Sequence, residues 1–185
     1  MIDVNQLRSG ITFLDGDDLL KVTDYSHSKP GRGKATIRVT VRNVRTGANF
    51  QKTFTSGDRV EDVRLEKHSF QYLYDDGQFF VFMNTGDYSQ KQVRYETFGD
   101  DKYYLKDNLD LELLLYGQEV VDYNLPPNVD LEVTEAENAV AGDTATGATK
   151  QVVLETGLRT KTPLFVNTGD VIRVSTTTGE YVTRV

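Results

Sequence analysis

The stretch that decides the fold is Leu19–Val44, which reads LLKVTDYSHSKPGRGKATIRVTVRNV. Apolar and polar residues alternate over Leu19–Tyr25 and again over Thr36–Val44, and this period of two predicts a β-strand in each segment. Ser26–Lys34 lies between them and contains one proline and two glycines, so it predicts a hairpin loop. Because successive side chains of a strand point to opposite faces, the second strand should bury its isoleucine and valines and expose its arginines.

The same pattern continues along the rest of the chain, with glycine turns between short strands. Asp15-Gly16 predicts a turn that leads from Ile11–Leu14 into the next strand, and Asp76-Gly77 predicts a tight hairpin between Phe70–Tyr74 and Gln78–Met83. One short helix is expected at Gln90–Phe98. Later strands are expected at Leu109–Tyr116, Asp130–Thr134, Gln151–Leu154, Thr162–Val166, Val171–Ser175 and Tyr181–Val185. Many short strands joined by such turns predict an all-β protein built of small barrels.

Two changes in composition divide the chain into three segments. The first lies near Arg64, where a segment with more basic than acidic residues gives way to an acidic one. The second is a linker in which Pro126 and Pro127 interrupt strand pairing and stiffen the backbone. The sequence therefore predicts three domains, at residues 1–63, 64–127 and 128–185.

The charge of the chain is unevenly distributed. The formal net charge is −7, yet residues 25–57 contain seven basic side chains and no acidic one. An acidic protein with one basic segment suggests a polyanionic partner that contacts that segment alone. The alternative is a basic face that is merely solvated. The seven cations are Lys29, Arg32, Lys34, Arg38, Arg42, Arg45 and Lys52.

Several classes of protein are disfavoured by what the sequence lacks. There is no cysteine and there are only two histidines, so cysteine-based metal sites, disulfides and thiolate nucleophiles are excluded. No catalytic motif is found, and Gly31–Lys34 lacks the spacing and the hydroxyl of a phosphate-binding P-loop. The longest apolar runs are far shorter than a membrane span, and the first residues do not resemble a secretory signal. We therefore expect a cytoplasmic, monomeric protein that is not an enzyme and that has no cofactor, metal site or membrane partner.

The predicted hairpin loop is the most informative segment. Pro30 fixes its own φ angle, while Gly31 and Gly33 permit a reversal and leave Arg32 unshielded by neighbouring side chains. A guanidinium at such a tip can bind phosphate and stack on bases, and Arg38 and Arg42 would continue the positive charge along the strand. An ordinary solvated hairpin tip is the alternative.

Ordered motifs along the whole chain resemble those of the bacterial elongation factor P family. The resemblance rests on Lys29–Gly33, on Leu73–Gly77 with Phe82–Asn84, on Pro126-Pro127, and on a series of C-terminal motifs. Those motifs are Gly142–Thr144, Leu154–Gly157, Pro163–Val166, Gly169-Asp170 and Thr178–Val185. The family implies an SH3-like (KOW-like) first domain and two OB-fold domains, in an L shape like that of tRNA. It also implies a translation factor that binds the ribosome between the P and E sites and speeds peptide bonds at stalling sequences, notably consecutive prolines.

The resemblance also assigns roles to particular residues. It implies that the tip, Lys29, Pro30, Gly31, Arg32, Gly33 and Lys34, contacts the acceptor end of P-site peptidyl-tRNA or initiator tRNA, and that Gly142, Asp143 and Thr144 lie near the E-site codon. Arg38 and Arg42 would contact the RNA backbone. Both ribosomal subunits and rRNA are the implied partners.

One position departs from many members of the family. They carry at the tip a lysine that is elongated by a modifying enzyme, whereas this chain has Arg32, which makes Arg32 a candidate modification site. Two alternatives stay open. One is an elongation-factor-P-like paralogue with a different stall or tRNA preference. The other is a single-strand RNA chaperone, which the acidic second and third segments disfavour.

Overall fold

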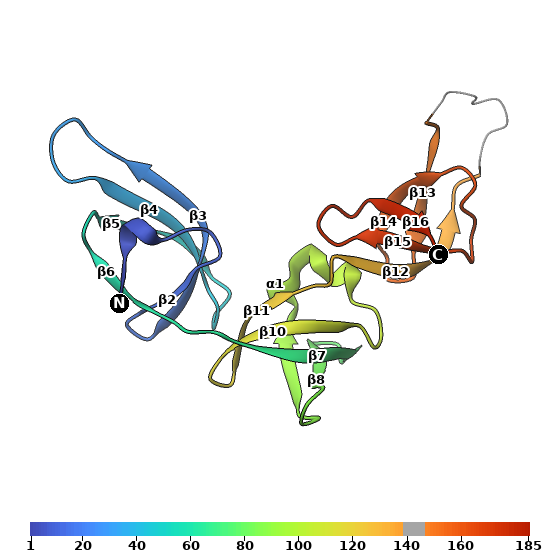
Figure 1. Cartoon of the computed structure of the whole chain (residues 1–185), viewed down its shortest axis with the longest axis horizontal. Coiled ribbons are helices and arrows are strands. Elements are labelled where there is room, and N and C mark those ends of the chain that lie inside the picture. The colour runs from blue at the N-terminus through green and yellow to red at the C-terminus, as the bar shows by residue number, and fades with distance from the viewer. Residues whose placement is uncertain (139–146) are drawn as a thin grey trace. The chain divides into compact units, whose positions relative to one another are not determined.

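The computed structural model describes residues 1–138 and 147–185, which form three β-sheets with very little helix (Figure 1). The predicted all-β fold with three sheet domains is confirmed. No helix in these two ranges is long and apolar enough to span a membrane. Two compact units are formed, Met1–Glu66 with Leu114–Val121, and Lys67–Leu113 with Asp122–Val185. The boundaries after residues 63 and 127 stay a prediction.

The first sheet has the strand order β1-β6-β2-β3-β4-β5. Its core contains Val4, Phe13, Leu20, Ile37 and Val39, each fully buried. The Phe54 ring packs edge-on against Phe13 at a centroid distance of 6.2 Å. The strands are β1 (Ile2–Asp3), β2 (Thr12–Asp15), β3 (Asp18–Ser28), β4 (Thr36–Asn43), β5 (Asn49–Thr55) and β6 (Arg59–Asp62), and a 3-10 helix, η1, spans Val4–Gln6.

The second sheet has the order β11-β10-β7-β8-β9 and an aromatic core. The Phe98 ring stacks on Phe82 at 5.4 Å and on Tyr123 at 4.2 Å between ring centroids, so one ring joins the helix to the sheet. The elements are β7 (Glu66–Asp75), β8 (Phe79–Asn84), β9 (Gln90–Arg94), α1 (Tyr95–Phe98), η2 (Gly99–Tyr104), β10 (Asp110–Tyr116) and β11 (Glu119–Asn124).

The third sheet has the order β14-β13-β12-β15-β16. Leu131, Val133, Leu154 and Ile172 form the centre of its core, and Tyr104 from η2 packs against the same cluster. The strands are β12 (Asn128–Ala136), β13 (Thr149–Leu154), β14 (Arg159–Pro163), β15 (Val171–Ser175) and β16 (Tyr181–Arg184).

The predicted turns at Asp15-Gly16 and Asp76-Gly77 are confirmed. Asp15 pairs with Asp18 across the first, and Asp75 pairs with Phe80 across the second. Gly16 and Gly77 have φ angles of +61° and +94°, which only glycine adopts without strain. Glycine at these two positions therefore favours the turns that the sequence predicts.

The prediction of a helix over Gln90–Phe98 is wrong for its first five residues. Gln90–Arg94 form strand β9, which pairs with Phe79–Met83, and only Tyr95–Phe98 are helical. Val93 is buried between exposed neighbours, which is the alternation of a strand. The polar side chains around Val93 hid that alternation.

The strand predicted at Thr162–Val166 is displaced. It runs over Arg159–Pro163, and the chain then turns, with the Val166 amide donating to the Pro163 carbonyl at 3.3 Å. Thr160 and Thr162 point into the core while Arg159 and Lys161 are exposed. Because the inward residues are threonines, the hydrophobic pattern gave no signal over this strand.

Candidate nucleic-acid interface

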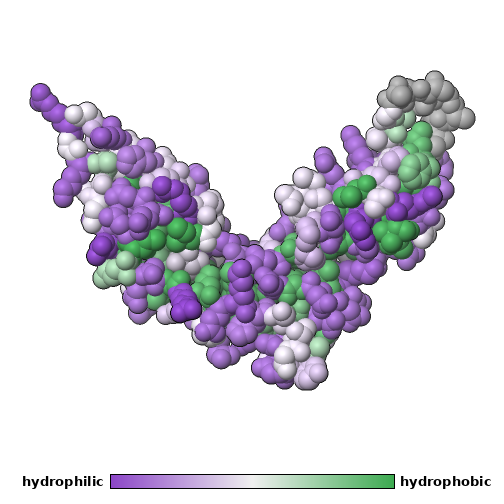
Figure 2. All heavy atoms as spheres, viewed as in Figure 1, coloured by the Kyte–Doolittle hydropathy of each residue, from purple (hydrophilic) through white to green (hydrophobic). Residues whose placement is uncertain are grey.

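The candidate interface is the hairpin formed by β3 and β4. Its register runs from Leu20 opposite Asn43 to Ser28 opposite Thr36, with an irregularity between Val22 and Asp24. The β3 strand extends beyond the buried core, because its residues from Ser26 to Ser28 are exposed, whereas Ile37 near the start of β4 is fully buried. Figure 2 shows mainly hydrophilic and neutral residues over the projecting end of this hairpin. The sequence pattern thus builds a hairpin whose loop and whose last β3 residues are exposed to solvent.

The tip of the hairpin holds the predicted site residues together. Lys29, Pro30, Gly31, Arg32, Gly33 and Lys34 are all exposed and lie consecutively in the loop between the two strands. Gly33 has a φ of +103°, whereas Gly31 has no left-handed φ, so the reversal requires glycine only at Gly33. A Cβ placed on either glycine would contact nothing within 4 Å, which leaves the space around Arg32 open.

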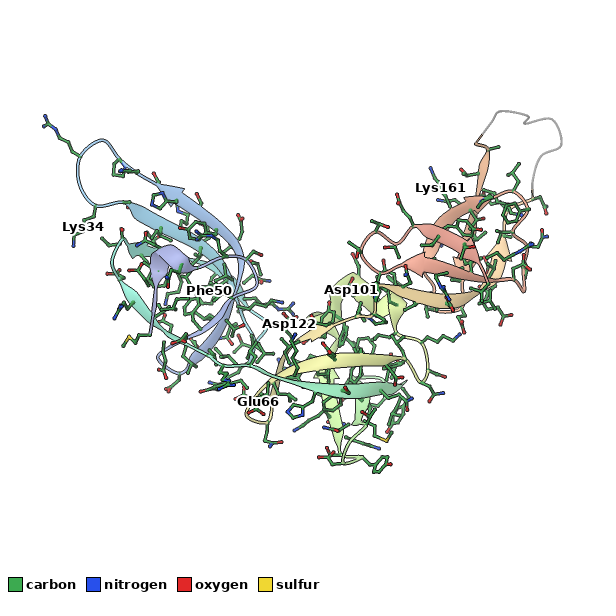
Figure 3. All side chains as sticks on the ribbon, viewed as in Figure 1. Lys34, Phe50, Glu66, Asp101, Asp122 and Lys161 are labelled. Atoms are coloured by element: carbon green, nitrogen blue, oxygen red, sulfur yellow. The ribbon has the colours of Figure 1, made fainter. Side chains whose placement is uncertain are left out.

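The cations of the tip are available to a partner. Among the residues that the structure describes, Lys29, Arg32 and Lys34 form no hydrogen bond or ion pair within the protein. Figure 3 shows the Lys34 side chain extending away from the ribbon. Three unpaired cations on one short loop create a local positive potential that attracts phosphate.

Arg38 and Arg42 continue this positive charge along β4. They alternate with Ile37, Val39 and Val41, which are fully buried, as the sequence predicted. Across the described chain neither arginine has a hydrogen bond or ion pair. Asp24, which lies opposite Thr40, places one carboxylate on the same face. The stripe is therefore positive but contains an acid.

Two of the seven predicted cations are engaged within the protein. The Arg45 guanidinium donates two hydrogen bonds of 2.8 Å to the Glu119 carboxylate, and Lys52 forms an ion pair with Asp15. The hydrogen bonds from Arg45 lower the pKa of the Glu119 carboxyl, so that pair stays ionised. The acids come from outside the acid-free segment. Of the seven cations of the basic segment, five on the hairpin thus have no partner in the described part of the chain, and two are neutralised.

Sequence reasoning missed Arg8, which adds a cation beside β3. Its guanidinium carbon lies 4.8 Å from the centroid of the Tyr25 ring, and its Nη1 donates to the backbone carbonyls of Asn5 and Leu7. A cation over an aromatic face is attracted by the ring quadrupole. No local pattern connects Arg8 with Tyr25, so only the folded structure reveals the contact.

Two further predictions concern residues outside the hairpin. Gly142, Asp143 and Thr144 lie outside the described residues, so the codon-loop assignment stays a prediction. Within residues 1–138 and 147–185, no group of three or more His, Asp or Glu side chains could hold a metal ion. The arrangement of the hairpin offers charge and hydrogen-bond donors, which can bind and orient a phosphate backbone.

Comparison with known proteins places all three segments in one family. Residues 3–60 match the elongation factor P KOW-like domain, residues 65–123 the elongation factor P OB domain, and residues 129–184 the elongation factor P C-terminal domain. An elongation factor P from Moorella thermoacetica is 44% identical over 184 residues, which cover 100% of both chains.

A solved structure shares the fold over part of the chain. It is a eukaryotic translation initiation factor 5A from Methanococcus jannaschii, which aligns with a TM-score of 0.51 and 20% identity over 68% of this chain and 90% of its own. The three family models and the relative from Moorella thermoacetica agree over residues 3–60, 65–123 and 129–184. The chain therefore belongs to the elongation factor P family of translation elongation factors.

Proposed function

We propose that this protein acts in the cytoplasm as a monomer that binds the ribosome between the P and E sites and stimulates peptide-bond formation at stalling sequences, notably consecutive prolines. The observation that carries the proposal is the β3–β4 hairpin, whose five cations have no partner among the described residues. A translation factor needs an exposed group that can reach RNA without competing contacts in its own fold. The hairpin tip meets that requirement.

The proposed contact of the tip is the acceptor end of the P-site peptidyl-tRNA or initiator tRNA. Arg32 would reach furthest, with Lys29 and Lys34 beside it, since a planar guanidinium binds phosphate in a bidentate way and stacks on bases. Arg38 and Arg42 would bind the RNA backbone further along the strand. The acidic remainder of the chain limits binding elsewhere on RNA, because phosphate repels it.

The proposed mechanism is positioning. The proline ring fixes φ and makes its nitrogen a hindered secondary amine, so consecutive prolines align poorly for attack. Holding the acceptor end in a reactive geometry lowers the barrier without a nucleophile or base, and orientation can supply up to about 7–11 kcal/mol. Rescue of a stalled step needs only part of that amount.

Further elements of the proposal lie away from the hairpin stem. Gly142, Asp143 and Thr144 would contact the E-site codon, and the domains at 1–63, 64–127 and 128–185 would span both ribosomal subunits along rRNA. We also propose Arg32 as the substrate of a modifying enzyme. The intact mass of natively expressed protein measures that modification directly, and a mass equal to that of the unmodified sequence would rule it out.

The proposal is tested by peptide synthesis on purified ribosomes. We expect added protein to accelerate a triprolyl product strongly and to leave a proline-free peptide of equal length unchanged, because only the former is limited by alignment. Equal rates with and without the factor on both templates would contradict the proposal. Acceleration of a different stalled template alone would identify the elongation-factor-P-like alternative.

A further inference from the structure

A second unusual cation lies in the third sheet, far along the chain from the hairpin. Lys150 is on β13, on the inward face that also carries Val152 and Leu154, and it is only 7% exposed. Long lysine stems pack well against apolar surfaces, but the ammonium still needs a counter-ion or water. Within the described part of the chain, Lys150 has no hydrogen bond or ion pair.

A buried hydroxyl without a partner lies directly across from Lys150. Thr162 on β14 pairs with Lys150 in the β13–β14 register and is 1% exposed, and its hydroxyl has no hydrogen-bond partner in residues 1–138 and 147–185. Thr160 faces the same core, yet its hydroxyl donates to the Gly179 carbonyl at 2.8 Å. Valine would fill the place of Thr162 without leaving a polar atom unsatisfied. Lys150 and Thr162 thus lie directly opposite each other in the sheet, and neither polar group has a partner among the described residues.

The other charged residues of this sheet that the structure describes form no ion pair with Lys150. Arg173 donates to the Asp130 carboxylate at 2.8 Å, and Arg184 lies 3.7 Å from the Asp170 carboxylate. On the strand beside β13, Glu135 lies opposite Val153 and so faces outward, while the Glu137 carboxylate accepts from the Gln151 amide at 3.0 Å. The acids nearest in register are therefore on the other face or already engaged.

We propose that Lys150 and Thr162 form an anion site that binds a phosphate group. The ammonium supplies a mobile positive charge and the hydroxyl supplies a hydrogen bond, a pair of donors that suits a phosphate oxygen. Residues directly opposite in a sheet have Cβ atoms about 4.5–5.5 Å apart, so the ammonium and the hydroxyl are within reach of one phosphate group. RNA backbone as the source of the phosphate rests on the proposed function; free phosphate is the other source.

The test uses the full-length protein and no ribosomes, so its result is independent of activity at prolines. Isotope-labelled protein is titrated with inorganic phosphate and, separately, with a ten-nucleotide single-stranded RNA, while amide signals of β13 and β14 are followed by NMR. We expect both probes to shift the signals around Lys150 and Thr162, and RNA to displace phosphate. A response to phosphate alone supports the site with free phosphate as its source.

Variants separate this site from general electrostatic attraction. Lys150→Gln is expected to weaken binding about fivefold and Thr162→Val about threefold, whereas Lys161→Gln should change it less than twofold. Lys161 is the matched control because it precedes Thr162 in β14 and is exposed on the outer face, where Figure 3 labels it. Equal losses in the Lys150 and Lys161 variants, or no shift at β13 and β14, would overturn the proposal.

A second substitution at Lys150 distinguishes loss of the ammonium from loss of the folded structure. Lys150→Met keeps the packing of the stem and removes only the ammonium. We expect this variant to melt at or above the wild-type temperature and to lose binding as Lys150→Gln does. Retained binding by a folded Lys150→Met protein would overturn the proposal as well.

Discussion

Two hairpin ends of this molecule use their polar residues in opposite ways. The β3–β4 hairpin ends in a loop whose Lys29, Arg32 and Lys34 have no partner among the described residues. The β7–β8 hairpin ends at Asp75 and Asp76, and both carboxylates are hydrogen-bonded within the turn. Both ends are exposed, so solvent access alone does not separate a binding tip from a structural one.

The difference lies in what the side chains already bind. Asp76 Oδ1 accepts from the Gln78 amide at 2.9 Å and from the Phe79 amide at 2.7 Å. Asp75 accepts from the Tyr95 hydroxyl and the Gly77 amide, and these bonds lower the pKa of the Asp75 carboxyl. The same bond to Asp75 raises the pKa of Tyr95 to about 12. This turn stabilises its own backbone, whereas the cations of the β3–β4 tip are not bound by any residue that the structure describes.

The largest effect that tests this comparison is expected for Arg32→Ala. In the proposed function this change removes the group that contacts the acceptor end, so triprolyl synthesis should fall about tenfold or more, towards the rate without the factor. Stability should change by less than about 0.5 kcal/mol, because Arg32 is exposed and has no hydrogen bond or ion pair with a described residue that the substitution would break. Rates on purified ribosomes and urea unfolding measure the two quantities.

Arg59→Ala is the matched control for Arg32→Ala. Arg59 is exposed on β6, two strands away from β3 in the same sheet, and its loss removes the same charge. We expect nearly wild-type triprolyl synthesis from this variant. Full activity of the Arg32→Ala protein, or an equal loss in both proteins, would remove the assigned role of the tip.

Arg32→Lys should have a smaller effect and distinguishes charge from geometry. A lysine keeps the positive charge but not the planar fork, which binds phosphate in a bidentate way and stacks on bases. We expect triprolyl synthesis to fall several-fold while ribosome affinity changes little. If the lysine protein works as well as the wild type, charge alone accounts for the tip.

Asp76→Ala should have the opposite effect to Arg32→Ala, because it should lower stability and leave activity unchanged. Two backbone amides of the turn lose their acceptor, and we expect a loss of about 1 kcal/mol in the free energy of unfolding. Triprolyl synthesis at a temperature where the variant is folded should stay unchanged. A selective loss of activity, without loss of stability, would show that the β7–β8 turn is also a binding tip.

The contrast between the two hairpins was only half visible in the sequence. Alternating residues around a loop with Pro and Gly predicted the β3–β4 hairpin, and Asp76-Gly77 predicted the β7–β8 hairpin. The burial of Ile37, Val39 and Val41 confirmed the outward stripe. These features are local, because a strand and its turn are encoded within about ten residues. The helix expected over Gln90–Arg94 failed because pairing with β8 overrides a weak local pattern.

The pairing of charges depends on contacts between distant parts of the chain. Arg45 is 74 residues from Glu119, and Lys52 bonds to Asp15 from another strand, so an acid-free segment could not reveal which of its cations are neutralised. The same holds for Arg8 over the Tyr25 ring and for Lys150 opposite Thr162. Side-chain availability is a tertiary property, and it is what distinguishes the two hairpin ends.

The smallest expected effect concerns the acid stability of the β7–β8 turn. Because hydrogen bonds from Tyr95 and Gly77 lower the folded-state pKa of Asp75, this carboxylate stabilises the fold at pH values above its unfolded value of 3.8, and that contribution is lost as the pH falls through the lowered folded value. Asp75→Asn keeps an oxygen that can accept both bonds but cannot titrate. The variant should therefore lose less unfolding free energy between pH 7 and pH 3 than the wild type does.

Asp107→Asn removes an exposed carboxylate that accepts no hydrogen bond from a described residue, so its pH profile should follow that of the wild type. Identical profiles for all three proteins would mean that the Asp75 carboxylate is as free as the cations of the other hairpin, and the comparison would fail at that residue.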